Sequence, residues 1–303
     1  MMNRNYLENF LAKEFKGEKI TFEGEGWGSC AFTVGENIVR FSKNNDISSY
    51  EKEQYIYGFL RNKIRFQMPQ INIVYGEINY SIHKKLIGEN WNIDTYNKLS
   101  DKNKSLFCDD IAEFFYEVHS TNLEELDEKI IKKPARLTID DFINFLKDDF
   151  NVQEIDNLYK YYCKVLDSGN DFVLAHQDFY EANSLVDKDH RLKIVFDFGN
   201  CGITERCLEF RTLTYYDDIF KRVIKNYETI SGVKIDITRI NDLNNIDPFG
   251  CLNYLRSTSL KDKMINEWNE NIGKIKMLLK KNRVNMCKND LSTFCVHETT
   301  INR

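Results

Sequence analysis

One segment near the middle of the chain restricts the fold more than any other, because it predicts a β-hairpin with polar side chains on both strands. The first half reads LAHQDFYEAN over residues 174–183, and the second reads LKIVFDFG over residues 192–199. A polar turn from Asp187 to His190 separates two apolar stretches that have the length of short strands. We therefore expect Asp178, Asn183 and Asp197 to lie close together in the folded chain.

The spacing of these polar residues is typical of a phosphoryl-transfer site. His176 and Asp178, an Asn five residues after Asp178 and a later Asp-Phe-Gly triplet form the pattern with which kinases place a catalytic carboxylate and two magnesium ligands. Asp178 would orient an acceptor hydroxyl and take its proton, and the oxygens of Asn183 and Asp197 suit Mg²⁺. Each half of the pattern alone can be structural or occur by chance, but both in order predict a kinase-like site.

The bulk properties fit an ordinary globular protein. At 303 residues the chain can form two lobes, and its 42% hydrophobic and 29% charged residues are unremarkable. We find no run long enough to span a membrane, no signal peptide and no basic cluster, so we expect a cytoplasmic protein without membrane or nucleic-acid partners. No heptad seam is present, which favours a monomer. The spacing of Cys287, Cys295 and His297 fits no zinc motif, so the eight cysteines are interpreted as reduced thiols.

The periodicity of apolar residues predicts an α+β, bilobal protein-kinase-like fold. A helix over residues 6–15 precedes an antiparallel sheet of five strands with one inserted helix, over residues 48–62. We expect the strands at residues 19–23, 30–34, 38–41, 71–75 and 80–86. Helical patterns dominate afterwards, with helices expected at 101–119, 138–150 and 153–166 and long helices after Glu205. We therefore expect a nucleotide-binding N-lobe over residues 1–87 and a C-lobe over residues 88–303, which carries the catalytic hairpin and a helical acceptor-binding region.

A glycine-containing turn and a hinge are expected to contact the nucleotide. Gly26, Gly28 and Ser29 lie between the first two predicted strands, where backbone N–H groups and a hydroxyl can bind phosphates, with Trp27 at the tip. Such a turn alone is weak evidence, since glycines are common in hairpins. The segment from His83 through Lys85 to Leu86 would bind the base edge with its backbone, and it leaves ATP and GTP as equal alternatives.

A cation on the third strand is expected to bind the nucleotide phosphates. Arg40 occupies the inward-facing position, and Glu53 on the following helix is its expected partner. Kinases usually carry Lys here, and Arg is not a neutral replacement, because its planar fork differs in reach. Lys43 is the rival phosphate ligand or a solvent-exposed charge at the end of the strand.

The segment after Asp197 indicates a small-molecule acceptor. Only a few residues separate Asp197 from the helix expected after Glu205, whereas protein kinases need a long activation segment to bind a peptide. The chain resembles the aminoglycoside phosphotransferases, and within them most closely the 2″-phosphotransferases. The resemblance covers nearly the whole chain and is carried by residues 52–60, 80–89, 98–120 and the hairpin.

The resemblance implies a role for each hairpin residue. It implies that Asp178 is the catalytic carboxylate, that Asn183 and Asp197 hold Mg²⁺, and that His176 braces the loop. Three departures concern the acceptor pocket: Gln177 stands where relatives often have Gly or Asn, Asn200 where many have Asp, and residues 205–210 alter a later acidic motif.

An aminoglycoside is a polycation, so its pocket should carry carboxylates and an aromatic wall. The candidates are Glu209, Asp217, Asp218 and Trp268, each of which also reads as part of an ordinary helix. Two alternatives remain open beside the antibiotic kinase. One is a metabolic kinase acting on choline, homoserine or a sugar, and the other is a catalytically silent nucleotide-binding protein.

Overall fold

The computed structural model describes residues 4–26, 28–43, 45–127, 136–257 and 264–289. It divides into two compact units, of which the first holds residues 1–134 and 170–237 and the second holds residues 135–169 and 238–303. The lobe boundary predicted after residue 87 lies inside the first unit, and that division stays a prediction. Among the residues described, no helix has the length and apolar character needed to cross a membrane.

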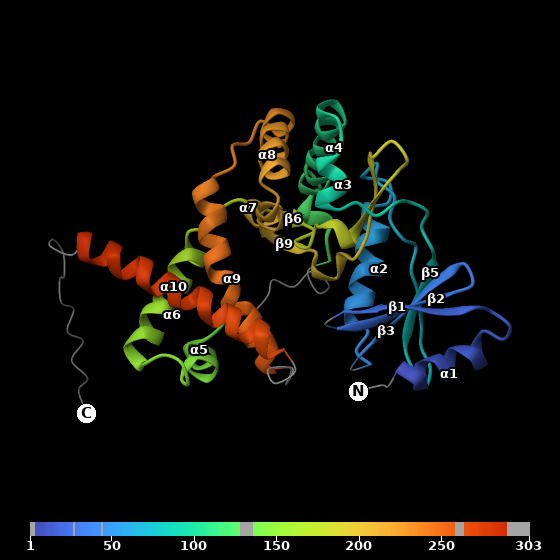
Figure 1. Cartoon of the computed structure of the whole chain (residues 1–303), viewed down its shortest axis with the longest axis horizontal. Coiled ribbons are helices and arrows are strands. Elements are labelled where there is room, and N and C mark those ends of the chain that lie inside the picture. Colours follow the sequence, from blue (N-terminus) through green and yellow to red (C-terminus); the bar gives the residue numbers. More distant parts are fainter. Residues whose placement is uncertain (1–3, 27, 44, 128–135, 258–263, 290–303) are drawn as a thin grey trace. The chain divides into compact units, whose positions relative to one another are not determined.

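The first unit begins with a five-stranded antiparallel sheet in the order β1-β2-β3-β5-β4 (Figure 1). Its strands are β1 (Ile20–Glu25), β2 (Ser29–Val34), β3 (Asn37–Ser42), β4 (Asn72–Val74) and β5 (Tyr80–Lys84). Helix α1 (Arg4–Glu14) packs Leu7 and Leu11 against a core that includes Phe32 and Phe41. The alternation along the strands leaves Arg40 on the other face, toward α2 (Ser48–Leu60). The predicted sheet and its single inserted helix are confirmed.

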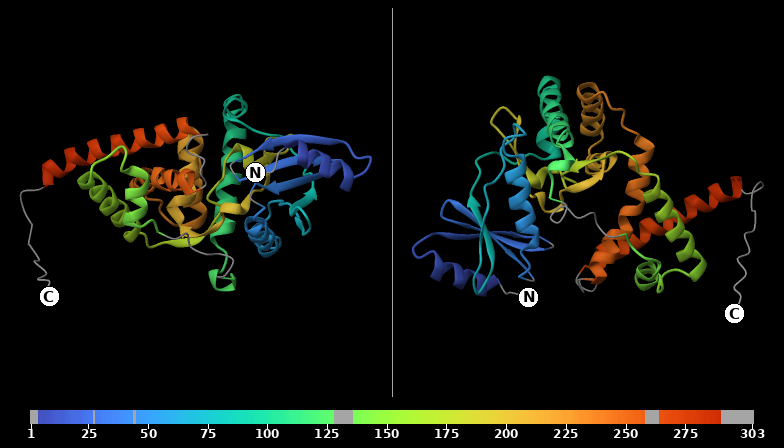
Figure 2. Two further views of the ribbon diagram at one scale, coloured as in Figure 1. Left: turned by 90° about the horizontal axis from the view of Figure 1, so that it is seen from below. Right: turned by 180° about the vertical axis from the view of Figure 1, so that it is seen from behind.

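The rest of the first unit surrounds the catalytic hairpin. Its long helices α4 and α8 pack along each other, as both views of Figure 2 show. The elements are α3 (Ile93–Asn97), α4 (Asp101–His119), β6 (Phe172–Ala175), β7 (Ser184–Val186), β8 (Leu192–Val195), β9 (Gly202–Glu205), α7 (Arg206–Glu209) and α8 (Asp217–Ser231). Strand β6 pairs with β9, and β7 pairs with β8. The helix predicted over residues 101–119 begins and ends as expected.

The second unit is helical over its described residues. It consists of α5 (Ile139–Leu146), α6 (Val152–Asp167), α9 (Ile237–Ser257, of which all but Ile237 belong to this unit) and α10 (Ile265–Asn289). Thr138 and Asn151 cap α5 and α6 through capping boxes, which explains why both helices begin where they do. Phe142 packs against Phe249, with ring centroids 4.7 Å apart, and forms part of the apolar core of this unit.

Candidate active site

The hairpin brings the predicted metal ligands together. The N–H of Phe196 donates to the backbone oxygen of Asn183 over 3.0 Å, so Asn183 lies opposite the residue that precedes Asp197. The Asn183 side chain donates Nδ2–H to the backbone oxygen of Asp178, 2.9 Å away. Asn183 therefore contacts the second half of the pattern through its backbone and Asp178 through its side chain.

Asn183 and Asp197 have the chemistry that a hard cation requires. Because Nδ2 of Asn183 is used for the Asp178 carbonyl, the side-chain Oδ1 remains as an acceptor, and Asp197 supplies a carboxylate on the neighbouring strand end. The part of the chain that the structure describes contains no cluster of three or more His, Cys, Asp or Glu side chains that could hold a metal. Two oxygen ligands suit Mg²⁺ bound together with nucleotide phosphates, since Mg²⁺ usually keeps water and phosphate ligands.

Asp178 is held between backbone and side-chain donors. Its N–H donates to Nδ1 of His176 over 3.2 Å, and its Oδ2 accepts from Nδ2 of Asn200, also over 3.2 Å. Burial raises the pKa of Asp178 above its ordinary value, with Asp197 adding to the rise and the Asn200 hydrogen bond opposing it. The carboxylate is thus a stronger base than a solvated Asp, which fits the role of proton acceptor.

His176 lies in the bracing position that the sequence predicts. The ring is completely buried, its Nδ1 accepts from Asp178, and its Nε2–H donates to the backbone oxygen of Phe196 over 3.0 Å. It therefore links the residue before Asp197 to Asp178. The buried ring is enclosed by protein and has no open path to an acceptor.

Two residues of the site adopt left-handed backbone conformations. Gln177 has φ 66°, and Asp197 has φ 63° and ψ 59°. This region is unfavourable for residues with a Cβ by about 1–2 kcal/mol. Asp197 is held there by Tyr57, whose hydroxyl accepts the Asp197 N–H over 3.0 Å. Gly adopts this left-handed conformation without steric cost, and Asn adopts it more readily than Gln does.

Glu209 binds the backbone of the turn before Asp178 and does not face an acceptor. It is 0% exposed, and its two oxygens accept the backbone N–H groups of His176 at 2.6 Å and Gln177 at 3.1 Å. The expectation that Glu209 contacts the acceptor is therefore corrected, because no bound molecule could reach this carboxylate. Its position stabilises the strained turn immediately before Asp178.

A chain of polar side chains extends from Glu209 toward the surface. Nε2 of His119 lies 3.5 Å from Glu209 Oε2, and Nδ1 of His119 lies 2.8 Å from the Tyr227 hydroxyl. Arg206 donates to the same hydroxyl and pairs with Asp171 through two hydrogen bonds of 2.6 and 3.0 Å. Burial lowers the pKa of His119, so the ring stays neutral inside this network.

Arg40 and Glu53 form the predicted pair. Arg40 NH1 lies 3.0 Å from Glu53 Oε2, and NH2 donates to Oε1 over 3.2 Å. Glu53 is 0% exposed, and the guanidinium lies over the Tyr50 ring at 4.8 Å. Burial and the nearby Asp197 raise the pKa of Glu53 to about 7, against the opposing effect of Arg40. The pair thus holds a cation beside Asp197, where nucleotide phosphates and Mg²⁺ would meet.

The other residues predicted to bind nucleotide lie around the same sheet. Across the glycine turn, the N–H of Gly26 donates to Ser29 O and the N–H of Lys43 donates to Gly28 O, both at 2.9 Å. Trp27 lies outside the described residues. Nζ of Lys43 is 2.5 Å from a carboxylate oxygen of Glu25, beside the glycine turn. Because Lys43 already has this partner, Arg40 is favoured as the phosphate ligand.

The two hinge residues differ in their surroundings. His83 is half-buried on the face of Arg40, and burial lowers its pKa. Lys85 is exposed, and its Nζ lies 3.2 Å from Glu23. Beyond the hinge, Gly88 approaches the next segment closely: a Cβ on Gly88 would lie 2.7 Å from the Cβ of Leu185 on β7. This contact fixes the hinge against the catalytic hairpin.

The remaining acceptor candidates are not assembled around Asp178 by any described contact. Asp217 pairs with Lys221 at 2.7 Å, and Asp218 accepts from Arg222 at 2.9 Å and from the Tyr96 hydroxyl at 2.7 Å. Both aspartates thus form the charged first turn of α8. Trp268 is 3% exposed within the second unit, so the expectation of an exposed aromatic wall there is corrected.

The sequence analysis missed three residues of the site. Tyr57 lies one helical turn after Glu53, so the spacing of four residues on α2 could have indicated that both face Asp197. Asn200 was noted only as a departure from the family pattern. It lies three residues after Asp197, which is expected beside Asp178, and this position could have indicated its contact with Asp178. His119 had no signal of its own, because its partners come from segments distant in the sequence.

Comparison with known proteins agrees with this geometry. The family model described as "Phosphotransferase enzyme family" matches residues 29–232 of the chain. The chain belongs to this phosphotransferase family. The matched region includes the Arg40–Glu53 pair, the hairpin and the Glu209 brace.

Solved structures of antibiotic phosphotransferases share the fold. An ADP-bound aminoglycoside phosphotransferase, APH(2'')-Ib, is 21% identical, with a TM-score of 0.67 over 90% of this chain and 98% of that chain. A gentamicin complex of APH(2")-IIa is 20% identical, with a TM-score of 0.70 over 91% and 96%. A type I macrolide 2'-phosphotransferase is 14% identical, with a TM-score of 0.60 over 90% and 98%. The same fold thus serves antibiotics of two chemical classes, so the fold does not by itself determine the acceptor.

Proposed function

We propose that this protein is a cytoplasmic, monomeric aminoglycoside kinase that transfers the γ-phosphoryl group of ATP or GTP to an acceptor hydroxyl and so confers antibiotic resistance. The observation that carries the proposal is the hairpin, in which Asn183 bonds to the Asp178 backbone and lies opposite Phe196, next to Asp197. The likeness to aminoglycoside 2″-phosphotransferases over 90% of the chain supports the choice of acceptor.

In this proposal each group of the site has one task. Arg40, held by Glu53, binds the donor phosphates, and Gly26, Gly28 and Ser29 bind them through the turn. Asn183 and Asp197 hold Mg²⁺, which neutralises the phosphate charge when bound. Asp178 accepts a hydrogen bond from the acceptor hydroxyl and takes its proton as the phosphoryl group is transferred.

The short segment after Asp197 supports a small acceptor. A single turn of 3-10 helix, Phe198–Asn200, leads directly into β9, which pairs with β6. No segment remains between them that could form a platform for a peptide substrate.

One observation favours a second class of acceptor. The positive charge of Arg211 acts on Asp178 and opposes the rise of its pKa. A polycationic drug would be repelled by a cation close to the reacting hydroxyl, whereas a neutral or anionic metabolite would not. A metabolic kinase is therefore the alternative. It is favoured if Arg211→Ala improves turnover of aminoglycosides relative to homoserine or sugars, and it is disfavoured if the ratio is unchanged.

The test is release of nucleoside diphosphate with Mg²⁺, with ATP and GTP in parallel, against a panel of aminoglycosides with choline, homoserine and simple sugars. We expect stimulation by an aminoglycoside. Asp178→Asn should lower kcat by about 10²–10⁴-fold, the usual contribution of a general base, while nucleotide still raises Tm. Asp189→Asn, an exposed carboxylate in the hairpin turn, is the matched control and should keep full activity. Unchanged turnover in Asp178→Asn would disprove the mechanism.

A further inference from the structure

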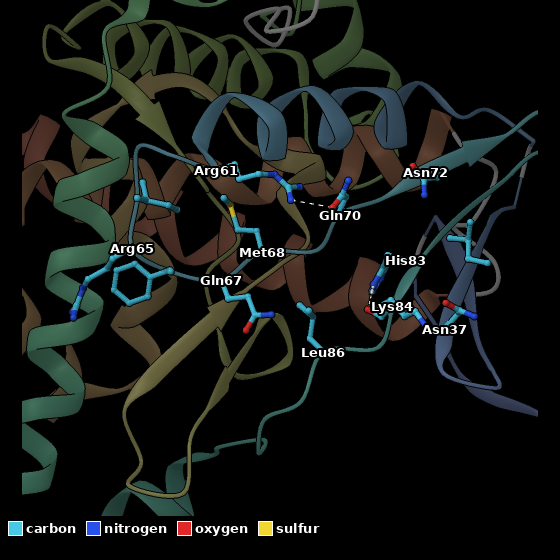
Figure 3. A pocket seen from close by; sticks show the side chains of 13 residues that line it. Asn37, Arg61, Arg65, Gln67, Met68, Gln70, Asn72, His83, Lys84 and Leu86 are labelled. Carbon is cyan, nitrogen blue, oxygen red and sulfur yellow. Dashed lines mark hydrogen bonds between the residues drawn. The ribbon is translucent and has the colours of Figure 1, made fainter.

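A cavity lies in the first unit, beside the β4 edge of the sheet. It has a volume of about 790 Å³ and is formed by residues between Asn37 and Leu86, from the end of α2, the segment that follows it, β4 and β5. Figure 3 shows Arg61 and Gln70 on one side of it, and His83 and Lys84 on the other. None of the residues assigned above to phosphate binding, metal binding or proton transfer lines this cavity, but His83, Lys84 and Leu86 of the hinge segment do.

The polar lining of the cavity has one sign of charge. It includes Arg61, Arg65 and Lys84 together with the side-chain amides of four residues, and none of its lining residues is acidic. The amides belong to Asn37, Gln67, Gln70 and Asn72. Amide N–H groups and arginine both donate hydrogen bonds, so this lining suits an anionic group.

Among the cations, only Arg61 lacks a carboxylate partner within the described residues. Arg65 pairs with Asp110, Glu113 and Glu117, and Lys84 pairs with Glu36 at 2.9 Å. The Arg61 guanidinium donates to the amide oxygen of Gln70 over 3.2 Å, which orients it without neutralising its charge. The cavity therefore offers one uncompensated positive charge at a defined place.

The remainder of the lining is apolar. Ile64, Phe66, Met68, Ile82 and Leu86 line the cavity beside the polar groups. A volume of this size lies in the range typical of pockets for small organic molecules, which combine apolar walls with a few oriented polar groups. An inorganic ion would leave the apolar walls uncovered, so the lining fits a molecule with an apolar body.

The wall of the cavity is joined to the strand that leads to Asp197. The N–H of Gln67 donates to Lys193 O at 2.9 Å, and the Gln67 carbonyl accepts from Val195 at 3.1 Å, so residue 67 adds to the edge of β8. Strand β8 ends two residues before Asp197. A molecule held against Gln67 would thus contact a segment whose position is coupled to the metal-ligand strand.

We propose that this cavity binds an organic acid, with one anionic group on Arg61 and the apolar body against Met68 and Leu86. The site lies beside the hinge segment and includes none of Arg40, Asp178, Asn183 and Asp197. The proposal is independent of which acceptor the enzyme uses. Occupancy restrains the Gln67 segment and, through β8, changes the turnover of the enzyme.

Titration calorimetry of the full chain with saturating ADP and Mg²⁺ tests this proposal. The probes are octanoate, 4-phenylbutyrate and naphthalene-2-sulfonate, each compared with an uncharged analogue of the same carbon skeleton. We expect at least one anion to bind tenfold or more tightly than its analogue. Arg61→Gln should remove that preference, and Arg61→Lys should retain part of it. Arg136→Gln is the control, because Arg136 pairs with Asp167 in the second unit.

A second variant locates the binding. Asn72 is exposed at the cavity, so Asn72→Trp should fold normally, as judged by Tm, and weaken binding of the anion by filling the opening. The proposal is overturned if no anion is preferred over its analogue, if Arg61→Gln binds as well as the wild type, or if ADP displaces the probe. The last result would place the probe in the nucleotide site.

Discussion

Glu53 and Glu209 are both completely buried carboxylates of the first unit, yet they are compensated in opposite ways. Glu53 faces the guanidinium of Arg40, whereas Glu209 accepts two backbone N–H groups from the turn before Asp178. The first arrangement holds a cation where the donor phosphates are expected. The second holds a strained backbone turn where the acceptor hydroxyl is expected. Loss of one should therefore affect the donor, and loss of the other should affect the chemical step.

The largest effect is expected for Glu209→Ala. It leaves two buried N–H groups without acceptors, at about 1–3 kcal/mol each, so the free energy of unfolding in urea should fall by about 2–6 kcal/mol. Because the turn at Gln177 then relaxes, kcat should fall by about 10²-fold, the effect of a misplaced reacting group. Glu209→Gln keeps one acceptor oxygen, so its free energy of unfolding and its kcat should lie between those of the wild type and the alanine variant. Wild-type kcat in the alanine variant would show that the brace is dispensable.

A comparable loss of stability, with a smaller effect on kcat, is expected for Glu53→Ala. Breaking a buried pair costs about 3–5 kcal/mol, because Arg40 is left without its partner. Bound nucleotide phosphates can replace the lost carboxylate, so saturating ATP or GTP should restore much of the stability, and KM for the donor should rise more than kcat falls. Arg40→Lys keeps the charge and serves as the comparison. If Glu53→Ala lowers kcat and leaves KM for the donor unchanged, the assignment of Glu53 to donor binding and Glu209 to the chemical step is wrong.

The pH dependence of stability tests the environment of Glu53. The pKa of Glu53 is raised from 4.5 to about 7, so between these values the folded chain retains a proton that the unfolded chain has lost. The free energy of unfolding should therefore decrease as pH rises through this interval, by up to roughly 3 kcal/mol, and be flat above it. Urea titrations from pH 4.5 to 8 should show this slope in wild type and a reduced slope in Glu53→Gln. Equal slopes in both would refute the assignment.

The smallest effect is expected for Gln177→Gly, which acts on the turn that Glu209 holds. Glycine removes the cost of the left-handed backbone, but the side-chain hydrogen bond from Gln177 to Asn200 O at 2.9 Å is lost. The free energy of unfolding should therefore rise by at most about 1 kcal/mol. In the Glu209→Ala background the same change should stabilise more, because the unbraced turn then depends on residue 177 alone. A double-mutant cycle in urea measures this coupling, and simple additivity would contradict it.

The same comparison explains what the sequence could predict. Arg40, Glu53 and the hairpin residues were found because strand alternation, helix spacing and a motif each act over a few residues. Glu209 was assigned to the acceptor, since a carboxylate whose partners are backbone N–H groups looks no different in sequence from one that faces solvent. The acceptor site was not found for a related reason: its expected residues come from segments joined only by the tertiary fold.

The contact between Gln67 and β8 has a consequence for synthesis of the chain. Asp110 accepts hydrogen bonds from Arg65, from Arg191 and from the N–H of Leu192, so residues 65–67 complete their bonding only with a strand more than a hundred residues later. On the ribosome the N-terminal sheet emerges long before that strand is made. Until then the backbone N–H and carbonyl of Gln67 have no strand to pair with, and Asp110 has only Arg65 of these three partners, so this segment stays incompletely bonded while the helices between it and β8 are translated.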